Sequence, residues 1–329
     1  MNAEQAYWVG LDVGGTKLLA CVFDKDFKLV AMEKKKTRGD KGNGSCVERT
    51  AEAVRDALAQ AKVNASGVSG IGVGVAGMLD LNRGVLLHAP NLGWKDVPLA
   101  DELKKTFKVP AVLANDVDAG TYGEYRFGAA RGSRCVVGVF PGTGIGGGCV
   151  YEGQLIRGKV GSCMEIGHML MDPNGRLCGC GRRGCLETVA SRLAISAEAA
   201  SAAFRGDAPE LLKRAGTDLA DIRSRALADA IKAGDKAVEK IVRHAARQIG
   251  LALVSVVHLL APDTVLLGGG LVEEMPDLFV EEAKDIVRTR AIKSFGESVR
   301  FVVAELGGKA TAMGAAALAA EAVRVRSKG

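Results

Sequence analysis

Hydrophobic residues along the chain form short apolar runs and helical repeats separated by glycine. The first apolar run ends at Asp12 and the Gly14-Gly15 corner, and Leu18 to Phe23 follows directly. Apolar runs on either side of a glycine turn predict a strand, a hairpin and a second strand. From Val136 the same plan recurs with a longer turn, Gly142 to Gly148. Two such units a domain's length apart predict a duplicated architecture.

Between and after the two hairpins, helical and strand patterns alternate, which predicts mostly buried sheets covered by helices. The predicted strands are Val68–Ala76, Ala111–Ala114, Thr264–Leu267 and Phe301–Ala304. The predicted helices are Val47–Val63, Leu99–Phe107, Asp235–Leu260, one that runs from Gly268-Gly269-Gly270 to Ile286, and Ala310–Val323.

One glycine-rich loop, His168 to Glu187, holds one of four histidines and three of eight cysteines. The imidazole of His168 and the thiolates of Cys178, Cys180 and Cys185 make a complete tetrahedral set for Zn²⁺, and a closed set indicates a structural metal. The alternative is a disulfide framework. No cationic and apolar leader precedes the first strand, so an oxidising compartment is not indicated.

We place a domain boundary near Val117. Residues 1–117 form the expected small N-terminal α/β domain, with the last helix, about 310–326, packing back onto it. Residues 118–309 form the expected large α/β domain, which carries the zinc loop 168–185. A chain of 329 residues is long enough for two such domains.

Composition excludes several classes of protein. The chain is 48% apolar and 25% charged, which is typical of a globular protein. Its net charge of +6 is mild, and the basic runs 34–36 and 324–328 contain no aromatic residues, so a solvated face is favoured over a nucleic-acid site. The longest apolar run, 249–262, is too short to span a bilayer. We therefore expect a cytoplasmic protein with no nucleic-acid or membrane partner.

Neither glycine hairpin belongs to a common nucleotide motif. The P-loop pattern is absent, because Gly14-Gly15-Thr16-Lys17 leads into a strand. The run Gly142 to Gly147 satisfies G-x-G-x-x-G, but it also leads into a strand, so the helix that a dinucleotide site requires is missing.

Glycine hairpins can still bind phosphate, because backbone N–H groups without neighbouring Cβ atoms form a concave donor cluster. Thr16, Lys17 and Thr143 add side-chain donors, and Asp12 stands where it can hold Mg²⁺. The alternative is two tight turns with no ligand.

Carboxylates supply the candidate chemistry. Asp116 follows a buried strand, where it is either the N-cap of a helix or a general base that accepts a hydroxyl proton. Glu165, His168 and Glu187 bracket the zinc loop and suit hydrogen bonding to a polyol, unless the glutamates are only surface charges.

Several motifs, spread in order over nearly the whole chain, resemble the ROK family of sugar kinases and repressors. The motifs are Asp12-Val13-Gly14-Gly15-Thr16-Lys17, Gly72 to Gly77, Asn91-Leu92-Gly93-Trp94, Asn115-Asp116, Pro141 to Gly148, Glu165-Ile166-Gly167-His168 and Cys178 to Glu187.

The resemblance implies a sugar kinase/actin-like fold in which two RNase H-like domains close over ATP and a sugar. It implies Asp116 as base, and sugar contacts from Gly77, Asn91, Asn115, Asp116, Glu165, His168 and Glu187. The implied phosphate residues are Asp12, Gly14, Gly15, Thr16, Lys17, Gly142, Thr143 and Gly144, with Gly269 and Gly270 near adenosine. The implied cofactors are structural Zn²⁺ and Mg²⁺ with ATP, and the family commonly forms homodimers or homotetramers.

The hypothesis is an ATP-dependent hexokinase of glucokinase type that phosphorylates the sugar 6-hydroxyl. Met164 and Lys159 add bulk beside the expected sugar pocket, so N-acetylmannosamine, N-acetylglucosamine, fructose or allose are alternative substrates. A non-catalytic sugar-sensing regulator is the alternative from another class. Repressors of the family carry an N-terminal helix-turn-helix segment, which we do not expect here because strand one starts almost at the first residue.

Overall fold

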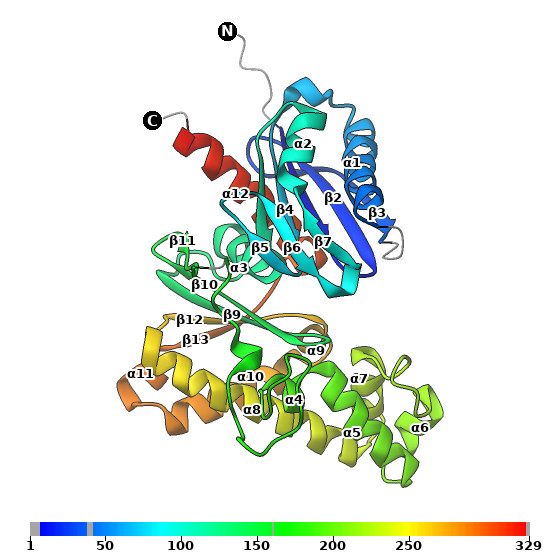
Figure 1. Cartoon of the computed structure of the whole chain (residues 1–329). Coiled ribbons are helices and arrows are strands. Elements are labelled where there is room, and N and C mark those ends of the chain that lie inside the picture. The colour runs from blue at the N-terminus through cyan, green and yellow to red at the C-terminus, as the bar shows by residue number, and fades with distance from the viewer. Residues whose placement is uncertain (1–6, 38–41, 160, 327–329) are drawn as a thin grey trace.

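The computed structural model describes residues 7–37, 42–159 and 161–326, and it contains two five-stranded sheets, one in each half of the molecule (Figure 1). The upper sheet has the order β3-β2-β1-β4-β8. Its strands are β1 (Tyr7–Val13), β2 (Lys17–Phe23), β3 (Leu29–Lys36), β4 (Val68–Val75) and β8 (Ala111–Asn115). The lower sheet has the order β11-β10-β9-β12-β13. Its strands are β9 (Cys135–Pro141), β10 (Ile145–Tyr151), β11 (Gln154–Leu155), β12 (Thr264–Leu267) and β13 (Arg300–Val303).

The predicted duplication is confirmed. In each sheet an antiparallel hairpin, β1–β2 or β9–β10, pairs with a parallel strand from later in the chain, β4 or β12. The glycine turns join the two strands of each hairpin. The α/β fold with duplicated sheets is therefore the one that the hydrophobic pattern predicts.

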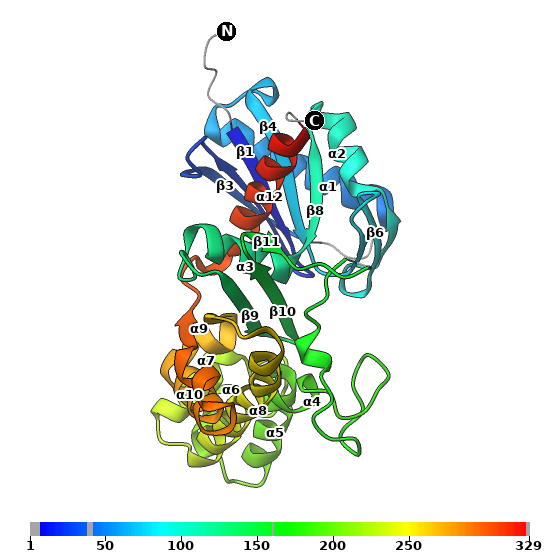
Figure 2. The ribbon, with the colours of Figure 1, turned by 90° about the vertical axis from the view of Figure 1, so that its left-hand side faces the viewer.

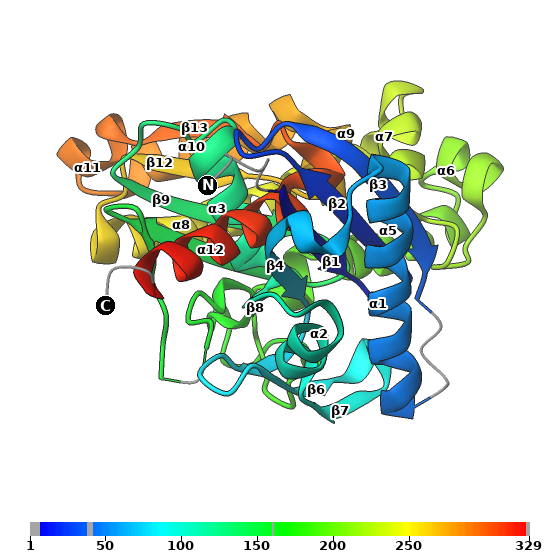
Figure 3. The same cartoon turned by 90° about the horizontal axis from the view of Figure 1, so that it is seen from above.

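Helices cover both faces of the upper sheet. On β2 the side chains of Leu18, Ala20 and Val22 belong to the core that includes α1 (Gly42–Ala61) and α2 (Leu99–Phe107). Leu19, Cys21 and Phe23 pack instead with α12 (Ala310–Arg326). Successive side chains of a strand point to opposite faces, so one continuous apolar run serves two helical layers. Figure 3 shows α12 on one side of β1 and β4 and α1 on the other.

The last helix approaches the upper sheet at glycine positions. A Cβ atom at Gly10 of β1 would collide with the carbonyl oxygen of Ala312, and one at Gly72 of β4 with that of Ala315. Glycine and alanine therefore allow the two backbones to touch. The expected return of the C-terminal helix to the first sheet is observed, while the domain division near Val117 stays a prediction, because α3 (Asp116–Phe127) contacts both sheets.

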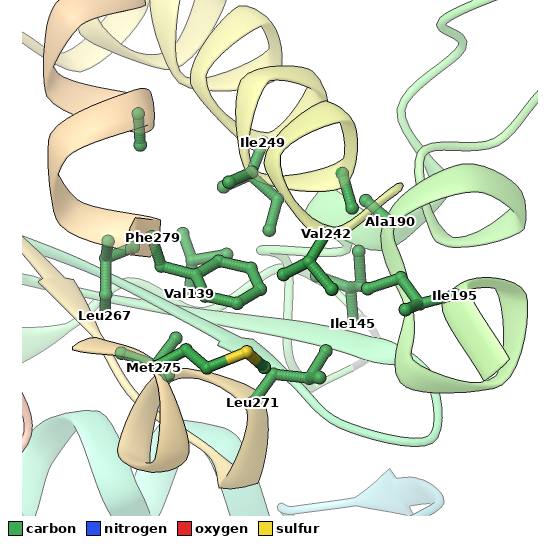
Figure 4. Packing of buried hydrophobic residues seen from close by; sticks show 14 of the residues in the cluster. Val139, Ile145, Ala190, Ile195, Val242, Ile249, Leu267, Leu271, Met275 and Phe279 are labelled. Atoms are coloured by element: carbon green, nitrogen blue, oxygen red, sulfur yellow. The ribbon is translucent and has the colours of Figure 1, made fainter. Parts of the chain in front are cut away.

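The lower half is built on a large helical core. The helices after the cysteine-rich loop 168–185 are α4 (Glu187–Ala190), α5 (Arg192–Phe204), α6 (Pro209–Ala215), α7 (Ser224–Lys232), α8 (Lys236–Leu260), α9 (Gly270–Glu274), α10 (Pro276–Arg290) and α11 (Lys293–Ser298). Figure 4 shows Val242 and Ile249 of α8 packed toward Phe279 of α10 and Val139 of β9. The buried face of α8 covers one side of the lower sheet.

Some elements differ from those that the sequence pattern predicts. The helix expected to run on to Ile286 is two helices, because the chain leaves helical geometry at Met275 before Pro276 and then continues to Arg290. Proline is accepted at the start of a helix but not in its interior. The small antiparallel sheet β5 (Met78–Asp80), β6 (Val85–Ala89) and β7 (Trp94–Val97) was not predicted. Within the described residues, every helix is too short or too polar to cross a membrane.

The contact between α12 and β4 predicts a stability effect. Gly72→Ala should lower the free energy of unfolding by about 1–3 kcal/mol, because the new methyl group forces α12 off the sheet. Gly308→Ala is the control, since a methyl group there would meet no described atom within 4 Å beyond its chain neighbours. Denaturant unfolding of both variants measures the effect, and equal midpoints would contradict the packing argument.

Candidate functional site

The N-terminus of α3 lies at the centre of the candidate site. Asn115 caps this helix, because its Oδ1 accepts hydrogen bonds from the N–H groups of Val117 (2.9 Å) and Asp118 (3.3 Å). Asp116 is the first helical residue, so the alternative that Asp116 is the N-cap is wrong. Its backbone carbonyl accepts a hydrogen bond from the Thr311 hydroxyl at 3.1 Å. The Asp116 carboxylate is therefore released from capping, and its backbone is held by a contact from α12.

Three of the predicted carboxylates lie close enough to influence one another. Burial, and then the charge of Asp116, raises the pKa of Asp12 from 3.8 to about 7. Burial also raises the pKa of Asp116, against hydrogen bonds from backbone N–H groups, and the charge of Glu165 adds to the rise. Like charges at short range oppose each other's ionisation. The fold thus brings the end of β1, the start of α3 and the Glu165 segment to one place.

The glycines of β10 make this convergence possible. Methyl groups at Gly146 and Gly148 would collide with Val117 and Thr121 of α3. A methyl group at Gly147, on the opposite face, would collide with the carbonyl oxygen of Met164. One glycine-rich strand therefore lets α3 approach on one side and the segment that carries Glu165 and His168 approach on the other.

The first glycine hairpin is closed by its own backbone and by the end of β3. Gly14 N–H donates to the Lys17 carbonyl at 2.9 Å. The Thr37 hydroxyl donates to the Gly14 carbonyl at 2.8 Å, and Thr37 N–H donates to the Thr16 carbonyl at 3.0 Å. Gly15, Thr16 and Lys17 remain exposed. The sequence pattern did not indicate Thr37, whose role depends on the pairing of β3 with β2.

The second glycine hairpin is held from α5 and from the Gly269 turn. Arg192 N–H donates to the Gly142 carbonyl at 2.8 Å, and its guanidinium donates to the Thr143 hydroxyl at 3.1 Å. Gly269 has φ of +82°, and a methyl group there would lie 3.0 Å from the Pro141 carbonyl. The start of the second hairpin and the Gly269-Gly270 turn therefore lie side by side. Arg192 was not predicted.

The four predicted metal ligands lie together. The ligand atoms of His168, Cys178, Cys180 and Cys185 are all within 4.8 Å of one another. Cys180 Sγ and Cys185 Sγ are 3.7 Å apart, and Cys178 Sγ lies 3.7 Å from His168 Nδ1. A tetrahedral ion with bonds of about 2.0–2.3 Å places its ligands at about this spacing. The donor set and its geometry both fit zinc.

Glu187 connects the cysteine cluster to the second hairpin. Its Oε1 accepts a hydrogen bond from the Cys178 thiol at 3.2 Å, and its Oε2 accepts one from Ile145 N–H at 3.2 Å. A methyl group at Gly144 would collide with the same carboxylate. In Figure 2 the segment between His168 and α4, drawn in bright green, extends away from the helices of the lower half. Glu187 lies where this segment rejoins α4.

Asp118 is a buried carboxylate that the sequence did not indicate. It is 2% exposed, and its Oδ1 has no hydrogen-bond partner among the described residues. Burial raises its pKa to about 6, while a hydrogen bond from Ser162 and the charge of Arg157 oppose the rise. Asp118 thus joins α3 to the segment that leads to Glu165.

Gly77, Asn91 and Lys159 are also expected from the sequence at or beside the sugar pocket. Gly77 has φ of +147° and lies against the His88 carbonyl, so this position requires glycine. The Asn91 side chain lies outside the described part of the structure. Lys159 is exposed and lines a separate cavity of about 340 Å³ with Leu79 and Arg157.

Known proteins are similar to this chain over nearly its whole length. Residues 8–322 match the ROK family. A glucokinase of Streptomyces coelicolor is 33% identical, with 95% of this chain and 97% of that protein covered. The crystal structure of a ROK family glucokinase from Streptomyces griseus in complex with glucose and AMPPNP has a TM-score of 0.82 and 33% identity, covering 96% of this chain and 99% of that one.

The ROK hexokinase structure from Thermus thermophilus has a TM-score of 0.79 and 33% identity, with 97% and 99% of the two chains covered. This likeness spans both sheets and the site between them, so the two-domain actin-like architecture is shared. The sequence and the fold lead to the same conclusion: the chain belongs to the ROK family, as a sugar kinase.

Proposed function

We propose that the protein transfers the γ-phosphoryl group of ATP to the 6-hydroxyl of a hexose, with glucose as the preferred acceptor. The observation that carries this proposal is the position of Asp116, whose carboxylate is coupled in charge both to Asp12 at the first hairpin and to Glu165 beside the zinc loop. A donor held by the hairpins and an acceptor held by the zinc-loop segment meet at this carboxylate.

Asp116 is proposed as the general base. The carboxylate accepts the proton of the sugar 6-hydroxyl while that oxygen bonds to the γ-phosphorus and the bond to ADP breaks. Burial raises the pKa of Asp116, and a base with a raised pKa binds the proton more strongly at the moment of transfer. Glu165, His168, Glu187, Asn91, Asn115 and Gly77 are the proposed sugar contacts.

The two hairpins are the proposed donor site. Gly14, Gly15, Thr16 and Lys17 on one side, and Gly142, Thr143 and Gly144 on the other, offer N–H groups and hydroxyls to the phosphates. Gly269 and Gly270 are the proposed neighbours of adenosine. Asp12 is the proposed ligand of Mg²⁺, which neutralises phosphate charge when it is bound.

Zinc is proposed as a structural ion. His168 and the three cysteines fill a tetrahedral shell, so they leave no position for a reacting water. Held in place, this cluster fixes His168 and keeps Cys178 beside the carboxylate of Glu187, which Ile145 N–H anchors from the hairpin.

Glucose is proposed because the chain is 33% identical to a glucokinase of Streptomyces coelicolor and 32% identical to one of Thermotoga maritima. Other hexoses and N-acetylated hexosamines remain the alternatives. Cytoplasmic location, which the sequence pattern favours, and a homodimeric or homotetrameric state, which rests on the family alone, are part of the proposal.

A panel of sugars tests the proposed activity. With ATP and Mg²⁺, the protein should release ADP with glucose at a higher kcat/KM than with fructose, allose, N-acetylglucosamine or N-acetylmannosamine. Sugar binding in calorimetry without ADP release from any member of the panel would instead indicate the sugar-sensing regulator.

Replacing the base separates binding from chemistry. Asp116→Asn should lower kcat by about 10²–10⁴-fold, because the amide accepts no proton, while the dissociation constant of the sugar stays within a few-fold. Steady-state rates and calorimetry on the preferred hexose give both values. Near-normal turnover in this variant would refute the assignment.

Metal analysis tests the cysteine cluster. The purified protein should contain about one zinc ion per chain, and Cys180→Ser should lose it together with most of the hexose affinity. Cys163→Ser is the matched control, since Cys163 is also exposed but lies outside the cluster. Full activity in a protein that contains no zinc would refute the proposal that the cluster binds a structural zinc ion.

A further inference from the structure

Arg192 places a cation on the second glycine hairpin. It is the first residue of α5, and the Ser191 hydroxyl caps this helix by accepting a hydrogen bond from Ala194 N–H at 3.2 Å. From this position the Arg192 backbone N–H donates to the Gly142 carbonyl at 2.8 Å, and Nη2 donates to Thr143 Oγ1 at 3.1 Å. The backbone hydrogen bond therefore holds the start of α5 on the turn, and the guanidinium bond holds the half-buried side chain against it.

The charge of Arg192 lacks an acidic partner in the part of the chain that the structure describes. In residues 7–37, 42–159 and 161–326, its side chain makes no ion pair, and its hydrogen-bond partner is a neutral hydroxyl. Arg205, at the other end of α5, is paired with Asp207 at 3.0 Å. A guanidinium has five N–H donors in a planar fork that matches phosphate oxygens. Most of the donors of Arg192 stay available to an anion.

The bond between Arg192 and Thr143 also orients the threonine hydroxyl. Because the guanidinium donates into Oγ1, the hydroxyl hydrogen must point away from Arg192. The Thr143 O–H group is then free to donate to a second acceptor at the exposed tip of the hairpin. A cation and an oriented hydroxyl therefore stand together on the backbone of a glycine turn.

We propose that Arg192 binds the phosphate chain of the nucleotide donor directly and orients Thr143 toward the same phosphate group. This inference rests on the proposed function, because it assigns a residue to the donor side of that site. Its ligand is a nucleoside triphosphate with Mg²⁺. Arg192 supplies positive charge from the second hairpin, whereas Lys17 supplies it from the first.

The test measures binding of Mg–AMPPNP by calorimetry in the absence of sugar. Arg192→Gln keeps a donor for Thr143 but removes the charge, and it should weaken binding by about 10- to 100-fold. Arg192→Lys keeps the charge and should recover a large part of the loss. Arg205→Gln is the matched control and should bind as the wild type does. Melting temperatures of all variants show whether α5 remains packed.

Wild-type affinity for AMPPNP in a folded Arg192→Gln protein overturns the inference. If the Arg192→Gln protein does not fold, Arg192→Met, which also removes the charge, takes its place. Wild-type affinity of the folded Arg192→Met protein for AMPPNP would likewise overturn the inference. A role confined to packing α5 would lower the melting temperature of both variants and leave the affinity of the folded protein unchanged, which also overturns it.

Failure of this inference is distinguishable from failure of the proposed function. If AMPPNP binding depends on Arg192 but no hexose is phosphorylated, the proposed function falls and the inference stands. If a hexose is phosphorylated and Arg192→Gln leaves the KM for ATP unchanged, the inference falls and the function stands.

Discussion

The site depends on the close approach of backbones around β10. Gly146 and Gly148 face α3, and Gly147 faces the segment before Glu165. A side chain at any of these three positions would push one of the two elements outward by at least the thickness of a methyl group. Interiors are packed too densely to absorb such a change without displacement. Asp116 and Glu165 can therefore approach each other because Gly146, Gly147 and Gly148 have no side chains. These three glycines contribute no reactive group themselves.

A second line of contact joins the cysteine cluster to the second glycine hairpin through Glu187. One oxygen accepts from Cys178, and the other accepts from the first N–H of β10 after the turn. Zinc binding favours thiolates, so a metal-bound Cys178 no longer donates a proton to Glu187. With the metal bound, the carboxylate would be free on the side of the cluster and would keep its hydrogen bond from Ile145 N–H on the side of the hairpin. A structural metal would in this way influence the charge of a proposed sugar contact without touching the sugar.

Sequence patterns predicted the helices and strands whose bounds depend only on the residues of the segment itself. Both hairpins follow from apolar runs and glycine turns, and α2 and β12 have the predicted bounds. The His168 and cysteine cluster was identifiable because all four of its residues lie within one short stretch. The prediction of one helix as far as Ile286 was wrong because Pro276 divides this segment into α9 and α10.

Residues that act through tertiary contacts carried no such signal. Thr37, Thr311 and Arg192 are distant in sequence from Gly14, Asp116 and Thr143, to which they bond. Each is an ordinary residue in its own segment. The same reason explains why Asn115 rather than Asp116 caps α3. Both are good capping residues, and the choice depends on where β8 releases the chain.

Burying carboxylates in the candidate site lowers the stability of the folded protein at neutral pH, and a bound cation, as proposed for Asp12, would offset part of this loss. Asp12 has a folded-state pKa near 7 against 3.8 for the free group, so ionising it opposes folding as the pH rises from about 4 to about 7. Burial raises the pKa of Asp116 and Asp118 as well. A cation near Asp12 would remove part of this cost, whereas an additional anion would increase it. A triphosphate that carries a bound divalent ion, as proposed for this site, would bring less negative charge to Asp12 than the free nucleotide would, and the guanidinium of Arg192 would offset further charge from the second hairpin.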